Sequence, residues 1–219
     1  MLNKIKQYIL NELIDLWNNI NIQFIITTLY CVMFILAPVF GNRIVSLFGQ
    51  PILMSSISMP MTLGLIDILN QNYGLSQARL AVLTAAIIRV VIWAIIGLLM
   101  LLPTFSMTEN FDKIIGDSFR FLLAGWGSTI VSQYFIDIPI FAYLKKTVKF
   151  GFGFRYNLSN IASGLILTVL FHVIAFWGTD KPIFKMIVIT WIFQVVIVAG
   201  LMSPIWIGIN KLIEKYRRV

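Results

Sequence analysis

The chain alternates long apolar stretches with short polar gaps, and this pattern predicts an α-helical membrane protein. A helix needs about 20 predominantly apolar residues to cross roughly 30 Å of hydrocarbon. We therefore predict an all-α fold, with six transmembrane helices in a single membrane domain over residues 1–219. The six predicted spans are 22–40, 44–69, 80–103, 119–144, 158–177 and 185–208.

The segment 1–20, before the first span, lacks both the apolar core and the small-residue cleavage site of a signal peptide. Its apolar residues follow helical spacing, which predicts an amphipathic helix at the membrane interface. These residues are Leu2, Ile5, Ile9, Leu13 and Leu16.

The second predicted span is interrupted by small and polar residues and by Pro51 and Pro60, each of which removes a backbone donor. Irregular backbone at membrane depth is tolerated only where protein or water surrounds it. We interpret 49–60 as a broken or kinked segment that borders a cavity. The alternative is a loop followed by a short helix that begins at Pro60.

The fourth span carries a polar stripe at four-residue spacing, formed by Gly125, Thr129, Gln133 and Asp137. Helical geometry places such residues on one face. A tight helix contact explains the small residues. A carboxylate inside a span is costly, at about 2.5 to 3.5 kcal/mol near the helix centre, and this cost makes Asp137 a candidate for substrate binding.

The fifth span repeats this arrangement with Asn160, Gly164, Thr168 and His172. Histidine has an unperturbed pKa near neutrality, so a role in proton coupling is chemically open to His172. The simpler interpretation is a neutral imidazole that is hydrogen-bonded in a helix contact.

Arg89 lies in the third span at a depth similar to that of Asp137. Pairing would relieve the desolvation cost of both charges, so we predict an Arg89–Asp137 ion pair near the cavity.

Composition supports the membrane prediction and excludes most catalytic chemistry. Hydrophobic residues make up 59% of the chain, and its mean hydropathy is +0.89. One His and one Cys cannot form a metal cage, and neither a hydrolase triad motif nor an ATP-binding loop is present in the sequence. We therefore expect no enzyme, no cofactor and no metal site.

The net charge of +8 is distributed as expected for a membrane protein rather than for one that binds nucleic acid. Eleven Lys and Arg lie in the N-terminal segment, in the second and fourth gaps between spans and in the tail, against five in or beside the other gaps, while Arg89 lies inside a span. The positive-inside rule therefore predicts that both termini are cytoplasmic.

Several segments resemble the queuosine precursor transporters of the vitamin uptake transporter family. The first matching segment is Pro60-Met-Thr62-Leu-Gly-Leu-Ile-Asp67, continuing to Tyr73-Gly74 and Ala78-Arg79. Later matches are Ser132-Gln133, Asp137, Phe141 and Lys145, then 159–163, 174–177 and Pro204. The likeness covers roughly residues 22–210.

The resemblance implies a multi-pass protein of the bacterial inner membrane that imports a 7-deazaguanine such as preQ0 or preQ1. It also implies a fold similar to the substrate-binding subunits of energy-coupling-factor transporters. Asp67, Gln133 and Asp137 would then line the site, with Arg79 at the cytoplasmic turn.

A planar base also needs an aromatic surface to stack on, for which Trp126 is a candidate. It needs hydrogen-bonding groups as well, for which Asn160 is a candidate. The predicted substrate-binding residues are Asp67, Arg89, Trp126, Gln133, Asp137, Asn160 and Gln194.

The chain departs from the family pattern at several positions. The usual Glu before Tyr-Gly is shifted to Gln71, and the step from Gln133 to Asp137 is one residue longer than in the family. Gly164 and Leu167 stand where members usually carry an amide and an acid, and Gln194 stands where a Lys is frequent. The joint loss of an acid and a base suggests a missing ion pair and leaves the exact ligand open.

Three classes of function compete. A transporter that works alone is favoured, because the first span from Phe24 to Val39 lacks the Gly and Ser that would dock an ATP-driven module. A vitamin-binding subunit of an energy-coupling-factor transporter is the alternative. A membrane-embedded enzyme or scaffold is the third. The expected partners are a small planar heterocycle and the lipid bilayer, with no nucleic acid, while a homo-oligomer stays open.

Overall fold

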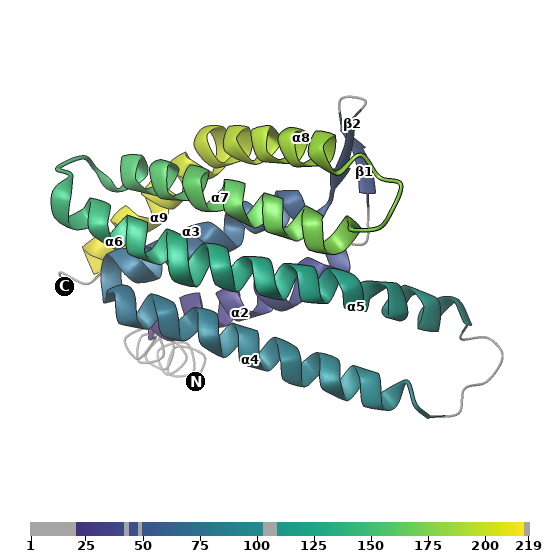
Figure 1. Cartoon of the computed structure of the whole chain (residues 1–219). Helices are drawn as coiled ribbons and strands as arrows, with labels where there is room; N and C mark the ends of the chain where they lie inside the picture. Colours follow the sequence, from purple (N-terminus) through teal and green to yellow (C-terminus); the bar gives the residue numbers. More distant parts are fainter. Residues whose placement is uncertain (1–20, 42–43, 48–49, 103–108, 217–219) are drawn as a thin grey trace, which may run out of the picture.

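The computed structural model describes residues 21–41, 44–47, 50–102 and 109–216, and nearly all of them are helical (Figure 1). The predicted helix over residues 1–20 lies outside the described residues. The elements are α2 (Ile22–Gly41), β1 (Ile44–Leu47), β2 (Gln50–Leu53), α3 (Ser55–Tyr73), α4 (Leu75–Leu99), α5 (Glu109–Thr129), η1 (Ile130–Asp137), α6 (Ile138–Thr147), α7 (Phe152–Phe176), α8 (Ile183–Val196), η2 (Ile197–Met202) and α9 (Ser203–Tyr216).

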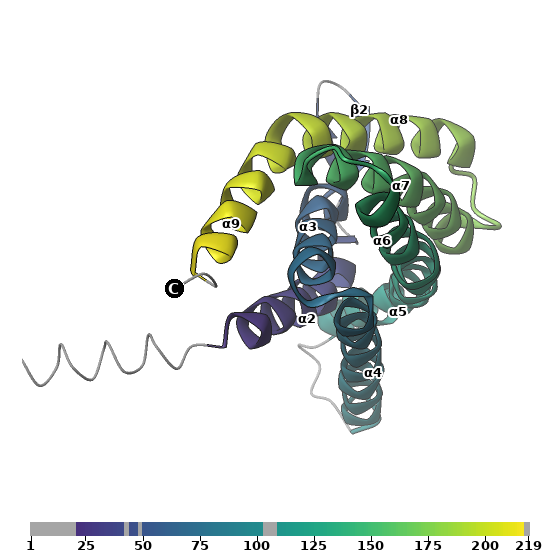
Figure 2. The same ribbon diagram turned by 90° about the vertical axis from the view of Figure 1, so that its left-hand side faces the viewer.

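The helix α3 lies at the centre of the bundle and contacts α2, α4, α6, α7, α8 and α9 (Figure 2). Every residue from Thr62 to Asn70 is buried. A helix buried all round must satisfy its polar side chains from its neighbours. This central helix therefore brings Asp67 into contact with several other elements.

The turn between α3 and α4 depends on Gly74, whose φ of 91° is rarely adopted by residues with a Cβ. The Gly74 N–H donates to the carbonyl of Asn70, and the Ala78 N–H donates to the carbonyl of Gly74. A single residue thus reverses the chain, and α4 packs against α3.

Two π-helical segments, η1 and η2, interrupt the longer helices, and each is followed by a proline. Pro139 comes two residues after η1, and Pro204 comes two residues after η2. Since proline has no backbone N–H, the regular α pattern fails there. Ile138 N–H instead donates to the carbonyl of Gln133, five residues back, and Ser203 N–H donates to that of Val198. The η1 segment contains Gln133 and Asp137, and π-helical turns are frequent at functional sites.

The predicted span over 44–69 is wrong in its first part. Strands β1 and β2 form an antiparallel hairpin with Leu47 opposite Gln50, and helix α3 begins only at Ser55. Pro60 lies inside α3 rather than at its start. A two-strand hairpin satisfies the backbone around Pro51 without requiring its missing donor in a helix.

Three helical stretches in the described part of the chain are long and apolar enough to cross a membrane: Leu75–Leu99, Phe152–Phe176 and Ile183–Lys215. A shorter apolar helix covers Ile22–Ala37. The central helix α3 is not among them, because the polar residues that it carries into the bundle lower its hydropathy.

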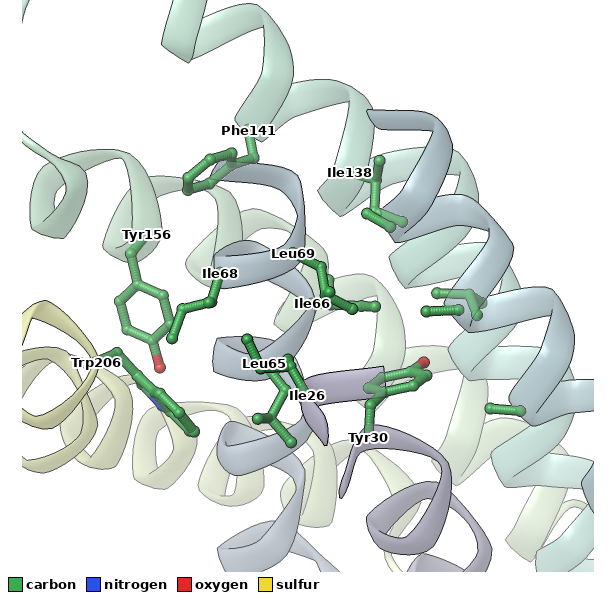
Figure 3. Close-up of a cluster of buried hydrophobic side chains, with 14 of the residues drawn as sticks. Ile26, Tyr30, Leu65, Ile66, Ile68, Leu69, Ile138, Phe141, Tyr156 and Trp206 are labelled. Carbon is green, nitrogen blue, oxygen red and sulfur yellow. The ribbon is translucent and has the colours of Figure 1, made fainter. Parts of the chain in front are cut away.

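The main apolar core surrounds α3. It joins residues of α2, α3, α4, α6, α7, η2 and α9, and Figure 3 shows ten of these buried side chains with labels. Tyr156 of α7 and Trp206 of α9 lie close together at one side of this core (Figure 3). The polar site described next lies within the same bundle.

Candidate functional site

Four of the predicted site residues form a buried group that we call the acid-amide cluster: Asp67, Gln133, Asp137 and Asn160. They come from α3, η1 and α7, and none is more than 2% exposed. Burying polar groups is costly unless they are hydrogen-bonded, so the contacts of each member matter.

The Asp67 carboxylate accepts a hydrogen bond of 2.6 Å from Asn160 Nδ2, which also donates to the Tyr156 carbonyl at 2.7 Å. Among the described residues, Asp67 Oδ1 and Asn160 Oδ1 have no hydrogen-bond partner. The pair therefore presents two free acceptor atoms.

Asp137 accepts a hydrogen bond of 3.0 Å from Ser163 Oγ, while its Oδ2 has no partner within the described ranges. Ser159 interacts with both Asp67 and Asp137, and the charges of the two acids act on each other. The two carboxylates are therefore neighbours across the contact of α3, η1 and α7.

The amide of Gln133 completes the cluster. Its Oε1 accepts a hydrogen bond from the Tyr30 hydroxyl of α2. Its Nε2 donor has no partner in the part of the chain that the structure describes. The cluster thus offers three free acceptors and one free donor, all from side chains held by neighbouring helices.

The predicted Arg89–Asp137 ion pair is wrong: no salt bridge joins the two residues, both of which the structure describes. The guanidinium of Arg89 lies 4.7 Å from the centre of the Phe34 ring, and Nη2 donates to the carbonyl of Leu122 at 3.3 Å. Equal depth on two helices does not set the direction of side chains. Arg89 points from α4 toward α2 and α5, whereas Asp137 points toward α7.

Gly125 explains how the bundle accommodates this arginine. A Cβ at this position would lie 2.8 Å from Arg89 Nη2. The first residue of the predicted polar stripe therefore provides room for a buried cation rather than a ligand contact.

The other predicted residues lie apart from the acid-amide cluster. Trp126 is 37% exposed on α5, and among the described residues no ring contact or hydrogen bond joins it to the cluster. Gln194 of α8 accepts a hydrogen bond of 2.9 Å from Thr168 Oγ1. It borders two small cavities, one of which also touches Asn160.

These cavities are too small for a heterocycle. The one that Gln194 shares with Asn160 has a volume of about 10 Å³, and the one that it shares with His172 has about 20 Å³. The latter has room for about one water molecule. A ring that binds at the acid-amide cluster therefore requires the helices around it to separate.

A larger groove of about 540 Å³ lies near the basic loop, between the start of α7 and α9. Gln71, Arg155, Lys211 and Glu214 line it, and Arg155 Nη2 donates to Gln71 Oε1 at 3.1 Å. Phe152 also lines the groove, and its ring stacks on that of Tyr156. The groove thus approaches the α7 residues that hold Asp67.

The sequence reasoning missed Tyr30, Ser159 and Ser163 as members of the site. A single tyrosine in an apolar span carries no signal of its own, because many such residues only fill space. The two serines were visible as part of a small-residue pattern, and only the fold shows that they face the acids.

Comparison with known proteins gives one family. The family model described as "Putative vitamin uptake transporter" matches residues 53–209, which include α3 to η2 and most of the cluster's surroundings. No curated protein and no solved structure matches the chain.

Proposed function

Because the chain belongs to this family of vitamin uptake transporters, we propose that it imports a queuosine precursor, a 7-deazaguanine, across the bacterial inner membrane. The observation that carries the proposal is the acid-amide cluster, where two buried acids and two amides converge and keep unpaired atoms. A buried polar group without a partner indicates a place where a ligand or water completes the hydrogen bonding.

The chemistry of the free atoms fits a deazaguanine. The edge of such a base that carries a ring N–H and an amino group presents adjacent donors, and a carboxylate accepts two of them side by side. Gln133 Nε2 can donate to the ring carbonyl. The cluster has more acceptors than donors, which favours a ligand rich in N–H groups.

The presence of two acids in the cluster also distinguishes between the two precursors, the aminomethyl and the nitrile form. Once one acid binds the base edge, the second remains without a counter-charge, and an ammonium group would supply one. We therefore propose that the aminomethyl form, which is cationic, binds more tightly than the neutral nitrile form. Arg89 does not neutralise this second acid by a salt bridge, because its contacts hold it against Phe34 and Leu122.

Three of the positions at which the chain departs from the family pattern lie on one side of the site. They support a difference in how this side contacts the ligand. Gly164 and Gln194 border the same cavity, and Leu167 and Gln194 border the next one. We propose that this side contacts an uncharged part of the ligand, because Gly164, Leu167 and Gln194 carry no charge.

We propose a topology of six membrane spans with both termini cytoplasmic and a fold similar to the substrate-binding subunits of energy-coupling-factor transporters. The three long apolar helices support a membrane location. One end of the bundle is basic. Lys145 and Lys146 lie in the last turn of α6 and Lys149 follows it, while Arg155 lies at the start of α7 and Lys211 in α9. By the positive-inside rule, this basic end supports the proposed cytoplasmic location of the termini.

The test is a binding panel with the purified chain in detergent, measured by calorimetry. We expect saturable binding of both deazaguanines, at least about tenfold tighter for the aminomethyl form, equivalent to about 1.4 kcal/mol. Guanine and the vitamins riboflavin, biotin and thiamine serve as comparisons. Tighter binding of a vitamin, or no binding of either deazaguanine by the folded chain, would show that the proposed substrate is wrong.

A further inference from the structure

A second buried polar group, which we call the histidine cluster, lies at the other end of α7. It consists of Thr168, His172, Thr190 and Gln194, which are all at most 8% exposed. The proposed binding of the heterocycle does not require His172, although this is the one histidine of the chain.

The contacts of His172 fix where its proton lies. Nδ1 is 2.8 Å from the carbonyl oxygen of Thr168. A carbonyl only accepts, so Nδ1 carries the hydrogen and Nε2 of the neutral ring is the acceptor. Thr190 Oγ1, at 3.4 Å from Nε2, then donates to it.

The same partners suit the protonated ring. A threonine hydroxyl both donates and accepts, so Thr190 can turn its hydrogen away and accept from a protonated Nε2. Nδ1 keeps its bond to the Thr168 carbonyl in both states. Proton uptake at Nε2 therefore breaks no contact of the imidazole.

A small cavity with both polar and apolar lining residues reaches this ring. His172, Thr190 and Gln194 line it together with Ser55 and Ser56 at the start of α3, next to the hairpin. Its volume of about 20 Å³ has room for about one water molecule, which could carry a proton to Nε2. The α7 residues that line the cavity, among them Thr168 and His172, belong to the second half of that helix. The basic loop precedes the first half of α7, and the hairpin lies near its other end (Figure 1).

The polar contacts of the imidazole are with uncharged groups, the Thr168 carbonyl and the Thr190 hydroxyl, and no hydrogen bond among the described residues joins it to a charged side chain. The rings of Phe171 and Phe176 flank it. The charged residues described at this end, Arg120, Asp180, Lys181 and Lys185, are exposed. The ring thus has no fixed counter-charge, and its protonation changes the charge of this region by a full unit.

The histidine cluster is connected to the acid-amide cluster. Thr168, whose carbonyl binds His172, donates its hydroxyl hydrogen to Gln194 Oε1 at 2.9 Å. Gln194 borders the cavity of about 10 Å³ that also touches Asn160, and Asn160 donates to Asp67. His172 lies on α7, the helix that also carries Asn160 and Ser163 of the binding site. A positive charge on His172 is thus linked to the acid-amide cluster through this helix and through Gln194.

We propose that His172 is a proton-binding site through which a proton is coupled to transport, an inference that rests on the transport function proposed above. The proton enters from the side of the hairpin, binds Nε2 while the substrate site is empty, and leaves when the substrate binds. Binding of a cationic substrate and of the proton then oppose each other, because both add positive charge to the same bundle.

The single histidine permits a direct test. Chain labelled with ¹⁵N-histidine, carrying a tag without histidine and placed in lipid nanodiscs, gives NMR signals from His172 alone. We expect the Nδ1–H tautomer at high pH and reversible conversion to imidazolium between about pH 8 and 5, the range in which a coupled proton must exchange. Imidazole signals that stay unchanged over this range would overturn the proposal.

Two variants and the substrate probe separate a proton site from a structural histidine. Thr190→Val removes the hydroxyl at Nε2 and is expected to shift the titration midpoint downward, whereas Thr179→Val, at an exposed threonine, is expected to leave it unchanged. Saturating 7-aminomethyl-7-deazaguanine is expected to lower the midpoint, and Gln194→Leu to reduce that shift.

An identical midpoint with and without bound ligand would overturn the coupling. Failure of the proposed substrate is seen separately in calorimetry, as absence of binding to the wild-type chain. If the substrate does not bind, the proposed coupling to this substrate is also wrong. The titration then still decides whether His172 binds a proton.

Discussion

The Asp137→Asn chain is expected to bind 7-aminomethyl-7-deazaguanine at least about 30-fold more weakly than the wild type. Removing one partner of a buried, hydrogen-bonded charge pair costs about 2 to 5 kcal/mol, and 2 kcal/mol corresponds to about 30-fold in Kd. Asparagine has nearly the shape of aspartate and keeps an oxygen for the Ser163 hydroxyl. The variant therefore removes the charge and one acceptor with little change in packing.

The matched control for this prediction is Asp180→Asn, at an exposed aspartate in the turn between α7 and α8. It changes the net charge equally and is expected to bind like the wild type. Thermal melting of both variants shows whether each is folded. A folded Asp137→Asn chain with the Kd of the wild type would place the substrate elsewhere in the protein.

The second large effect concerns stability. Gly64→Ala is expected to lower the melting temperature by about 2 to 12 °C, because the new methyl group would overlap the indole of Trp206. Trp206 is 6% exposed in the main core, so its ring has little room to move. Overpacking of this kind costs about 1 to 3 kcal/mol.

Gly208→Ala provides the comparison, since a Cβ at that exposed position of α9 meets no atom of the described residues within 4 Å. Its melting temperature is expected to stay the same or rise, because alanine favours a helix over glycine by about 1 kcal/mol. Adding Trp206→Leu to Gly64→Ala is expected to recover part of the loss, as leucine leaves space for the methyl group. Equal melting temperatures for Gly64→Ala and Gly208→Ala would contradict the packing of α3 against α9.

The apolar periodicity predicted the all-α class and the positions of most helices, but not the local structure around Pro51. The stretch 44–69 is apolar enough to suggest a span, yet its first residues form a hairpin. Hydropathy averages over a window and does not distinguish a helix from two short strands of similar composition. It also undervalues α3, which is the most enclosed helix and carries Asp67.

The site was partly predictable because polar residues in apolar spans are costly. That argument selected Asp67, Gln133, Asp137 and Asn160, and the fold brings them together. It could not predict the directions of side chains on different helices. Arg89 contacts Phe34 instead of Asp137 for this reason.

For the aromatic residues Tyr30 and Trp126, too, the sequence does not predict the direction of the side chain. Tyr30 lies in an apolar span and donates to Gln133, whereas Trp126 lies on the outside of the bundle. Both are ordinary residues of a membrane helix, so their sequence positions alone do not separate a buried hydrogen-bonding role from an exposed one. Only the packing of α2 against the other helices makes the difference visible.

The central claim is that the acid-amide cluster binds the substrate of a transporter. Its most direct test is uptake of radiolabelled 7-aminomethyl-7-deazaguanine into proteoliposomes that contain the wild type, Asp67→Asn or Asp180→Asn. We expect saturable uptake by the wild type and by Asp180→Asn, and none above empty liposomes by Asp67→Asn. Equal uptake by folded Asp67→Asn, or no uptake by the folded wild type, would contradict it.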